Sequence, residues 1–167
     1  MFKTLCALSI LLTITAHSAF AIEEGDLAPM FTLPDIAEGN PAISLEDLRG
    51  KTVYVDFWAS WCAPCLRSMP LINELYNKYQ DQDQDFEVIA INVDDPIEDG
   101  QDFLLDTPLD FLIAADTDNT VLNRFEVTGM PTSFLIDKEG IVRMVHMGFR
   151  GNDIEVIEAA ITQLLAE

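Results

Sequence analysis

Apolar residues follow two different periodicities along this chain. Short apolar runs rich in β-branched and aromatic residues, typical of buried strands, cover residues 53–58, 86–93 and 132–136. Longer segments repeat apolar residues every three or four positions, the spacing of a helix, at about 66–79 and from about 153 onward. Because strands alternate with helices before a final hairpin and helix, the pattern predicts an α/β fold in which helices flank a mixed central β-sheet.

Weaker patterns predict an N-terminal extension and a central insert. The extension is expected to hold two short strands and one helical turn, at 31–33, 42–44 and 45–49. The insert is expected to hold a helix at about 97–105, a short strand at about 111–115 and a second helix at about 119–125. Asp118 is a candidate N-cap for the second of these helices. The turn sequence at 137–140 predicts a hairpin before the last strand, 141–147.

The charge balance narrows the choice of partners. Nine Lys and Arg residues stand against 29 Asp and Glu residues, so the net charge is −20. Such a chain is repelled by nucleic acid and by anionic lipid, and neither is expected as a partner. The acidic residues form no single block, which favours a self-repelling soluble surface over a dedicated site for a basic partner. We expect a monomer with one domain over 22–167.

Residues 1–21 have the features of a cleavable signal peptide. Lys3 supplies the positive start, residues 5–16 are apolar, and Ala19-Phe20-Ala21 is a small-x-small cleavage site. The apolar run is shorter than the roughly 20 residues that span a bilayer, so we expect no stable membrane insertion after cleavage. The sequence therefore predicts cleavage after Ala21 and a periplasmic or secreted protein. Cys6 would leave with the leader.

The mature chain would keep two cysteines, Cys62 and Cys65. A pair so close in sequence hardly stabilises a fold, because the stabilisation grows with the length of the loop that a disulfide closes. The pair lies where a predicted strand meets a predicted helix, and the free N–H groups and dipole of a helix N-terminus favour a thiolate. We therefore expect Cys62 to be the exposed nucleophile and Cys65, one turn further, to be the more buried partner. A redox-active disulfide of this kind requires no other cofactor.

A metal site is the alternative use of these cysteines. Zinc usually takes four ligands, and the only histidine outside the leader, His146, lies in a predicted strand. A Cu(I) site built from the cysteines and a methionine stays open as an alternative, with Met130, Met144 and Met147 as candidates. Spacing and context favour redox chemistry, and no metal ligand is assigned.

Asp56 is a third candidate for the chemistry. Alternation along the strand puts it on the same face as Tyr54 and Trp58. In a strand covered on both faces, its carboxyl would be buried beneath the cysteines with a raised pKa, which suits proton exchange with Cys65. The alternative is an aspartate at the end of the strand that reaches solvent.

Two segments together resemble the thioredoxin superfamily, and within it the exported thiol-disulfide oxidoreductases of the TlpA/ResA type. They run from Val55 to Cys65 (VDFWASWCAPC) and from Gly129 to Asp137 (GMPTSFLID). The resemblance extends from about Gly25 onward and implies a thioredoxin fold. It also implies that Cys62 attacks a substrate disulfide and that Cys65 resolves the mixed disulfide.

The same resemblance implies how a substrate is held. The Met130–Pro131 bond would be cis and face the cysteines, and the Met130 backbone would pair with an extended substrate segment. Trp61, Ala63 and Pro64, which surround the cysteines, are the other expected substrate contacts.

This chain departs from the TlpA/ResA pattern in its acid. Members of that branch often carry a Glu three residues after the second cysteine and an Asn six residues before the first, where this chain has Ser68 and Asp56. We therefore expect the proton-handling role to lie with Asp56. The implied function is reduction of disulfides in exported proteins, as in cytochrome c maturation or copper-site assembly, with electrons from a membrane thiol donor. A thiol peroxidase is a further alternative, although peroxiredoxins carry a Thr where this chain has Ala59.

Overall fold

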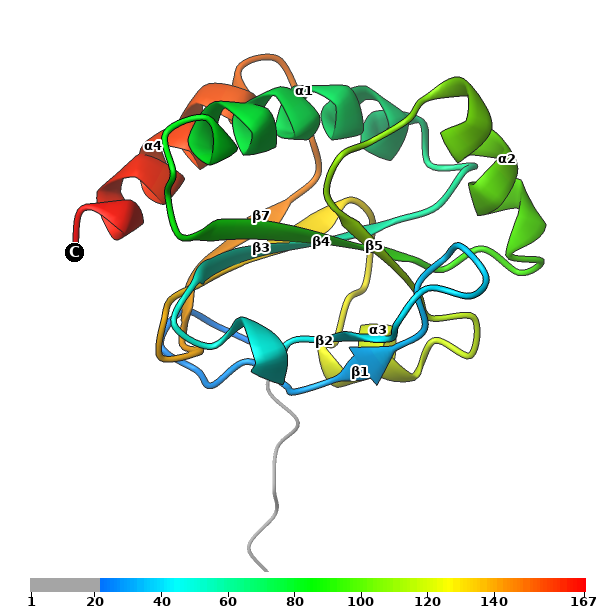
Figure 1. The fold of residues 1–167 in the computed structure, drawn as a ribbon, viewed down its shortest axis with the longest axis horizontal. Coiled ribbons are helices and arrows are strands. Elements are labelled where there is room, and N and C mark those ends of the chain that lie inside the picture. Colours follow the sequence, from blue (N-terminus) through cyan, green and yellow to red (C-terminus); the bar gives the residue numbers. More distant parts are fainter. Residues whose placement is uncertain (1–21) are drawn as a thin grey trace, which may run out of the picture.

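A five-stranded mixed sheet forms the middle layer of the protein (Figure 1). The computed structural model describes residues 22–167, so the predicted leader and Cys6 lie outside the described residues. The strand order is β5-β4-β3-β6-β7. The strands are β3 (Thr52–Trp58), β4 (Phe86–Asn92), β5 (Leu112–Ala115), β6 (Thr132–Ile136) and β7 (Val142–Met147). β3 is central, parallel to β4 and antiparallel to β6, as the mixed-sheet prediction requires.

Helices and the N-terminal extension cover the two faces of this sheet. On one side lie three helices, α1 (Ala63–Gln80), α2 (Glu98–Asp106) and α4 (Asp153–Leu165) (Figure 1). On the other side lie the extension and one short helix, with elements β1 (Thr32–Leu33), β2 (Ile43–Ser44), η1 (Glu46–Leu48) and α3 (Thr120–Arg124). Among residues 22–167, no helix is both long and apolar enough to cross a bilayer.

The central strand is buried along its whole length. All seven residues of β3 are at most 3% exposed, because both faces of the strand are covered. Phe57 packs against Phe125 and Phe134 on the α3 side, with ring centroids 5.3 and 6.1 Å apart. Trp58 faces the opposite way and packs on Phe103 of α2, at 5.5 Å. Alternation therefore puts Tyr54 and Asp56, like Trp58, on the side of the long helices.

The prediction that Asp118 is the N-cap of α3 is wrong. Asp118 accepts a hydrogen bond from the Thr120 N–H (3.0 Å), but the residue that precedes the helix is Asn119, with φ of 57°. The buried Asp116 does more of the capping, since its two carboxylate oxygens accept from the N–H groups of Val121 (3.2 Å) and Leu122 (2.8 Å). Asp116 follows β5 directly, so the strand end positions the cap.

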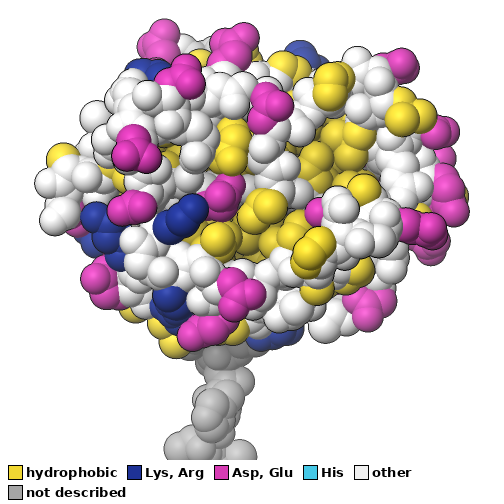
Figure 2. Space-filling model, viewed as in Figure 1, with side chains coloured by type: hydrophobic (Ala, Val, Ile, Leu, Met, Phe, Trp, Pro, Cys, Tyr) yellow, Lys and Arg dark blue, Asp and Glu magenta, His cyan; other side chains and the backbone are white. Residues whose placement is uncertain are grey.

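Acidic side chains are spread over the surface rather than gathered on one element. Figure 2 shows them scattered across one whole face, with few basic side chains among them. This distribution agrees with the sequence, in which carboxylates occur along the entire chain.

One close contact in this fold gives a stability prediction. Gly100 of α2 lies against Asn92 at the end of β4, and a Cβ on it would lie 2.7 Å from Asn92 Nδ2. Helix propensity alone favours Gly100→Ala by about 1 kcal/mol. We expect the clash to dominate and the substitution to lower the free energy of unfolding by about 1–3 kcal/mol in denaturant titrations. Gly129→Ala, where a Cβ meets nothing within 4 Å, is the matched control and should change stability little. A stabilised Gly100→Ala variant would contradict this packing.

Candidate active site

Cys62 and Cys65 lie at the junction of β3 and α1. Cys62 is the N-cap of α1, and its sulfur accepts a hydrogen bond from the Cys65 N–H at 3.3 Å. The two sulfurs form a disulfide of 2.04 Å, with Cα atoms 5.3 Å apart. Ala63 and Pro64 lie in the first turn of the helix. An N–H there has no partner within the helix, so its absence from proline costs no hydrogen bond. The helix end can therefore stabilise a thiolate on Cys62 once the disulfide is reduced.

The order of exposure agrees with the prediction, but the absolute exposure of Cys62 does not. Cys65 is fully buried, and Cys62 is only 5% exposed. The disulfide draws the Cys62 sulfur in over the helix end, close to the Cys65 N–H. Trp61, which is 69% exposed, is therefore the side chain beside the disulfide that a partner meets first.

The Met130–Pro131 peptide bond is cis, as the resemblance implies. Strand register pairs Thr132 with Phe57, so Pro131 lies level with the end of β3, next to the start of α1. Met147 pairs with Thr132 and is 64% exposed. Together with Trp61, it gives this end of the sheet two exposed apolar side chains.

The Met130 backbone is open to a partner. Within residues 22–167 neither its N–H nor its carbonyl takes part in a backbone hydrogen bond. The Pro131 carbonyl, in contrast, accepts from the Gly148 N–H at 2.8 Å. Met130 therefore offers one free donor and one free acceptor to an extended segment, the arrangement that strand addition uses.

Asp56 is buried on the α1 side of β3, and the alternative of a solvent-reaching aspartate is wrong. It is 3% exposed, and register places Ser133 directly opposite it on β6. Ser133 Oγ donates to Asp56 Oδ1 at 2.9 Å, and the Tyr54 hydroxyl donates to Ser133 Oγ at 2.7 Å. Burial raises the pKa of Asp56 to about 7, against the lowering effect of the Ser133 hydrogen bond. Burial and the neighbouring Asp56 charge raise the pKa of Tyr54 well above its ordinary value.

A buried carboxyl with a pKa near neutrality can both hold and release a proton at physiological pH. Ser133 and Tyr54 were not identified from sequence as its partners. Alternation does place Tyr54 on the face of Asp56, but the position of Ser133 depends on the register between β3 and β6.

Asp94 is the other residue that the sequence did not reveal. It is 1% exposed and fixes the loop before the cysteines, because the Ser60 N–H and hydroxyl both donate to its carboxylate at 2.9 Å. The Asn92 amide donates to the same carboxylate at 2.7 Å. The signal in the sequence was the pair of polar residues, Asn92 and Asp94, at the end of a buried strand. In the fold these residues hold the loop before the cysteines from β4, the parallel neighbour of β3.

The other residues considered for the chemistry, Ser68, His146 and Met144, are held within the fold. Ser68 is buried and donates to the Cys65 carbonyl at 2.9 Å, so no carboxyl stands at that place. His146 is half-buried on β7, with Nε2 3.3 Å from an Asp153 oxygen. Met144 lies half-buried on the same strand. Over residues 22–167, no three His, Cys, Asp or Glu side chains cluster as metal ligands would.

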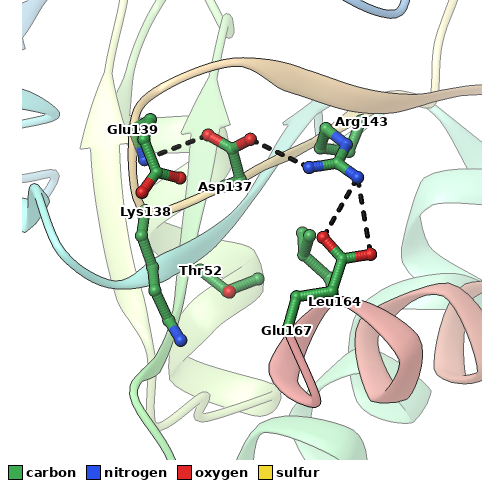
Figure 3. A pocket seen from close by; sticks show the side chains of 7 residues that line it. All are labelled: Thr52, Asp137, Lys138, Glu139, Arg143, Leu164 and Glu167. Carbon is green, nitrogen blue, oxygen red and sulfur yellow. Dashed lines mark hydrogen bonds and ion pairs between the residues drawn. The ribbon is translucent and has the colours of Figure 1, made fainter.

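A polar cavity of about 100 Å³ lies at the opposite end of the sheet (Figure 3). Arg143 crosses it and pairs with Asp137 at 3.2 Å and with Glu167 at 3.1 Å. Thr52, which also lines it, is six residues from Trp58 along β3, about 20 Å away in a strand. This cavity is therefore separate from the cysteine site.

The ionisation of Asp56 gives a prediction on stability. Its pKa is higher in the folded than in the unfolded chain, so the folded state binds the extra proton and loses stability as pH rises from about 4 to 7. Asp56→Asn removes this cost. In the oxidised protein we expect the variant to be more stable than the parent at pH 8, by on the order of 4 kcal/mol, and nearly equal at pH 4. Denaturant unfolding at both pH values measures this, and a gain that does not depend on pH would contradict it.

Comparison with known proteins agrees with this geometry. The Redoxin family model matches residues 23–161. Thiol-disulfide oxidoreductase ResA of Geobacillus thermodenitrificans (strain NG80-2) is 43% identical over 128 residues, which are 77% of this chain and 71% of that protein. ResA of Bacillus subtilis (strain 168) is 36% identical over 128 residues, 77% of this chain and 69% of that one.

A solved structure has the same fold. The crystal structure of a thiol:disulfide interchange protein DsbE from Chlorobium tepidum has a TM-score of 0.81 and 41% sequence identity, covering 87% of this chain and 99% of that one. With a redox-active cysteine pair on a thioredoxin fold, the chain belongs to the redoxin family, in the ResA-type thiol-disulfide oxidoreductase branch of the thioredoxin superfamily.

Proposed function

We propose that this protein reduces disulfides of exported proteins outside the cytoplasm, in processes such as cytochrome c maturation or copper-site assembly. The observation that carries the proposal is the Cys62–Cys65 disulfide at the N-terminus of α1, on the sheet face that also buries Asp56. The predicted leader supports the location.

Binding begins at the surface around Cys62. Trp61 and Met147 offer exposed apolar area, and the Met130 backbone offers a free N–H and carbonyl. A substrate segment that pairs with Met130 brings its disulfide to the end of β3, where α1 begins. Ala63 is exposed and Pro64 half-buried, so the two residues between the cysteines leave room for that approach.

The reaction is a two-step exchange. In the reduced protein, the Cys62 thiolate attacks one sulfur of the substrate disulfide, forms a mixed disulfide and releases the other substrate sulfur as a thiolate. Cys65 then loses its proton and attacks Cys62, which frees the second substrate thiolate and forms the Cys62–Cys65 disulfide. Two electrons pass to the substrate, and a thiol donor at the membrane must return them before the next cycle.

Asp56 acts on the second of these steps. Cys65 is fully buried and so holds its proton tightly, because burial disfavours a thiolate. Asp56 lies on the same side of the sheet, and its pKa of about 7 makes it a base of suitable strength at neutral pH. The proton of Cys65 passes toward this carboxylate as Cys65 attacks.

The surroundings of Cys62 favour reduction over oxidation. Strong oxidants of this fold stabilise the nucleophilic thiolate strongly. Here the two intervening residues, Ala63 and Pro64, carry no charge or donor side chain, and the nearby acid adds negative charge when ionised. The helix N-terminus is thus the main stabilising feature for the thiolate.

The roles of Cys62 and Cys65 predict different outcomes for the serine variant of each. Cys62→Ser should abolish reduction of a disulfide-containing peptide, because the remaining thiol, Cys65, is fully buried. Cys65→Ser should stop after the first step and accumulate a mixed disulfide, detected as a mass increase of the protein that dithiothreitol reverses. A stable mixed disulfide in Cys62→Ser instead would reverse the assignment.

The role of Asp56 predicts a pH-dependent loss of rate. Asp56→Asn should slow the resolving step about tenfold or more near pH 7, and less near pH 9, where solvent base can deprotonate Cys65. Stopped-flow release of the second substrate thiol measures this step. Glu87→Gln is the matched control, since it removes another buried carboxylate, on β4 far from the cysteines. An unchanged rate in Asp56→Asn at neutral pH would remove the proton-handling role.

The direction of electron flow is tested by the reduction potential of the Cys62–Cys65 pair, from equilibration in glutathione or dithiothreitol buffers. We expect a value near that of thioredoxin, roughly −270 mV, because the thiolate has little stabilisation beyond the helix end. A value near roughly −120 mV would make the protein an oxidant that introduces disulfides, and the reductive function would be wrong.

A further inference from the structure

A groove of about 600 Å³ lies along α1, beyond the cysteine pair. One wall comes from the second and third turns of α1, and the other from the loop between β7 and α4. Its lining residues are Arg67, Pro70, Leu71, Phe149, Arg150 and Gly151. The groove therefore combines an apolar floor with two arginines.

Both walls of the groove adjoin residues of the expected substrate surface. Along α1, Arg67 is one turn from Ala63 and lies on the same helix face, about 6 Å further along the axis. On the other wall, Phe149 and Arg150 follow Gly148, whose N–H donates to the carbonyl of Pro131. Both walls of the groove therefore begin close to residues that flank the cysteine pair and the cis-proline.

The two arginines in the groove have no acidic partner of their own among the described residues. Within residues 22–167, neither guanidinium forms an ion pair, whereas Arg49, Lys51, Lys78 and Arg143 all do. Asp153 is the acidic residue nearest to Arg150 in the sequence. Its carboxylate accepts from the Arg150 backbone N–H at 2.7 Å instead, and it lies 3.3 Å from His146 Nε2. Both arginines are exposed, so their charge is available to a partner.

We propose that this groove binds an acidic segment of the protein substrate, next to the cysteine that Cys62 attacks. This inference rests on the proposed function and names the substrate feature that the same site selects. A protein with a net charge of −20 repels acidic partners at long range, and two unpaired arginines beside the reactive pair offset that repulsion locally. Apolar side chains of the same segment contact Leu71 and Phe149.

Helix geometry sets where the acidic residues lie in the substrate. Arg67 to Leu71 are five to nine residues beyond Cys62, or about 8–14 Å along the axis. An extended chain advances about 3.3 Å per residue, so the preferred Asp or Glu stands roughly two to four positions from the substrate cysteine.

The experiment compares two peptides that contain the same intramolecular disulfide. One carries Glu at the second to fourth positions beyond the attacked cysteine, and the other carries Gln there. With dithiothreitol-reduced protein at low salt, we expect the ratio of the second-order rate constant for reduction of the Glu peptide to that for the Gln peptide, each in a single turnover, to be about three to ten. The ratio should approach one in 0.5 M salt, because salt screens exposed charges.

Single variants then assign the preference to the groove. Arg67→Gln and Arg150→Gln should each lower the ratio toward one. Lys138→Gln is the matched control, since it also removes one cation that forms no ion pair among the described residues, at the opposite end of the sheet, and should keep the parent ratio.

Each outcome bears on a separate claim. If the parent protein reduces the Gln peptide but shows no preference for the Glu peptide, the groove inference is wrong and the proposed function stands. An equal fall of the ratio in Lys138→Gln would mean that overall charge sets the preference, which also overturns the inference. Failure to reduce either peptide would overturn the proposed function itself.

Discussion

The burial of β3 on both faces is the constraint on which the rest of this structure depends. A strand covered by helices on one side and by the extension on the other has no exposed residue, and the chain is next exposed at Trp61, beyond its carboxyl end. After that end a short loop, held by Asp94, leads into α1, so the cysteines stand at a helix N-terminus supported by a rigid strand. The same burial makes Asp56 a group whose charge is costly, which raises its pKa into the range useful for proton transfer.

Three chain segments far apart in sequence meet around the disulfide because of the order of the strands. β4 lies on one side of β3 and brings Asp94, which holds Ser60 through both its N–H and its hydroxyl. β6 lies on the other side and brings the cis Met130–Pro131 bond and Ser133. A parallel neighbour therefore fixes the loop before the nucleophile, while an antiparallel neighbour supplies the substrate-pairing backbone and the partner of the buried acid.

The surface charge gives the site a second kind of selectivity. Carboxylates cover the protein, and half of the eight Lys and Arg residues in 22–167 are paired with them. Arg67 and Arg150, two of the four in that range that form no ion pair, line one groove beside α1. Exposed charges interact weakly one by one, so a preference set by this pair would adjust which segment binds without controlling the exchange chemistry.

The sequence by itself determined the α/β class, the order of nearly every element and the identity of the reactive pair. Periodicity is a local property, and the motif around Cys62 and Cys65 lies within one strand and one helix turn, so both could be read without knowing the fold. Alternation likewise predicted the face of Asp56. Only the tertiary structure decided that Ser133 lies opposite Asp56, that Asp94 rather than a nearer residue holds the active-site loop, and that Asp116 caps α3. It also decided that Arg67 and Arg150 share one groove. Each of these depends on strand register or on packing between distant segments, and a linear pattern of apolar and polar residues does not encode either.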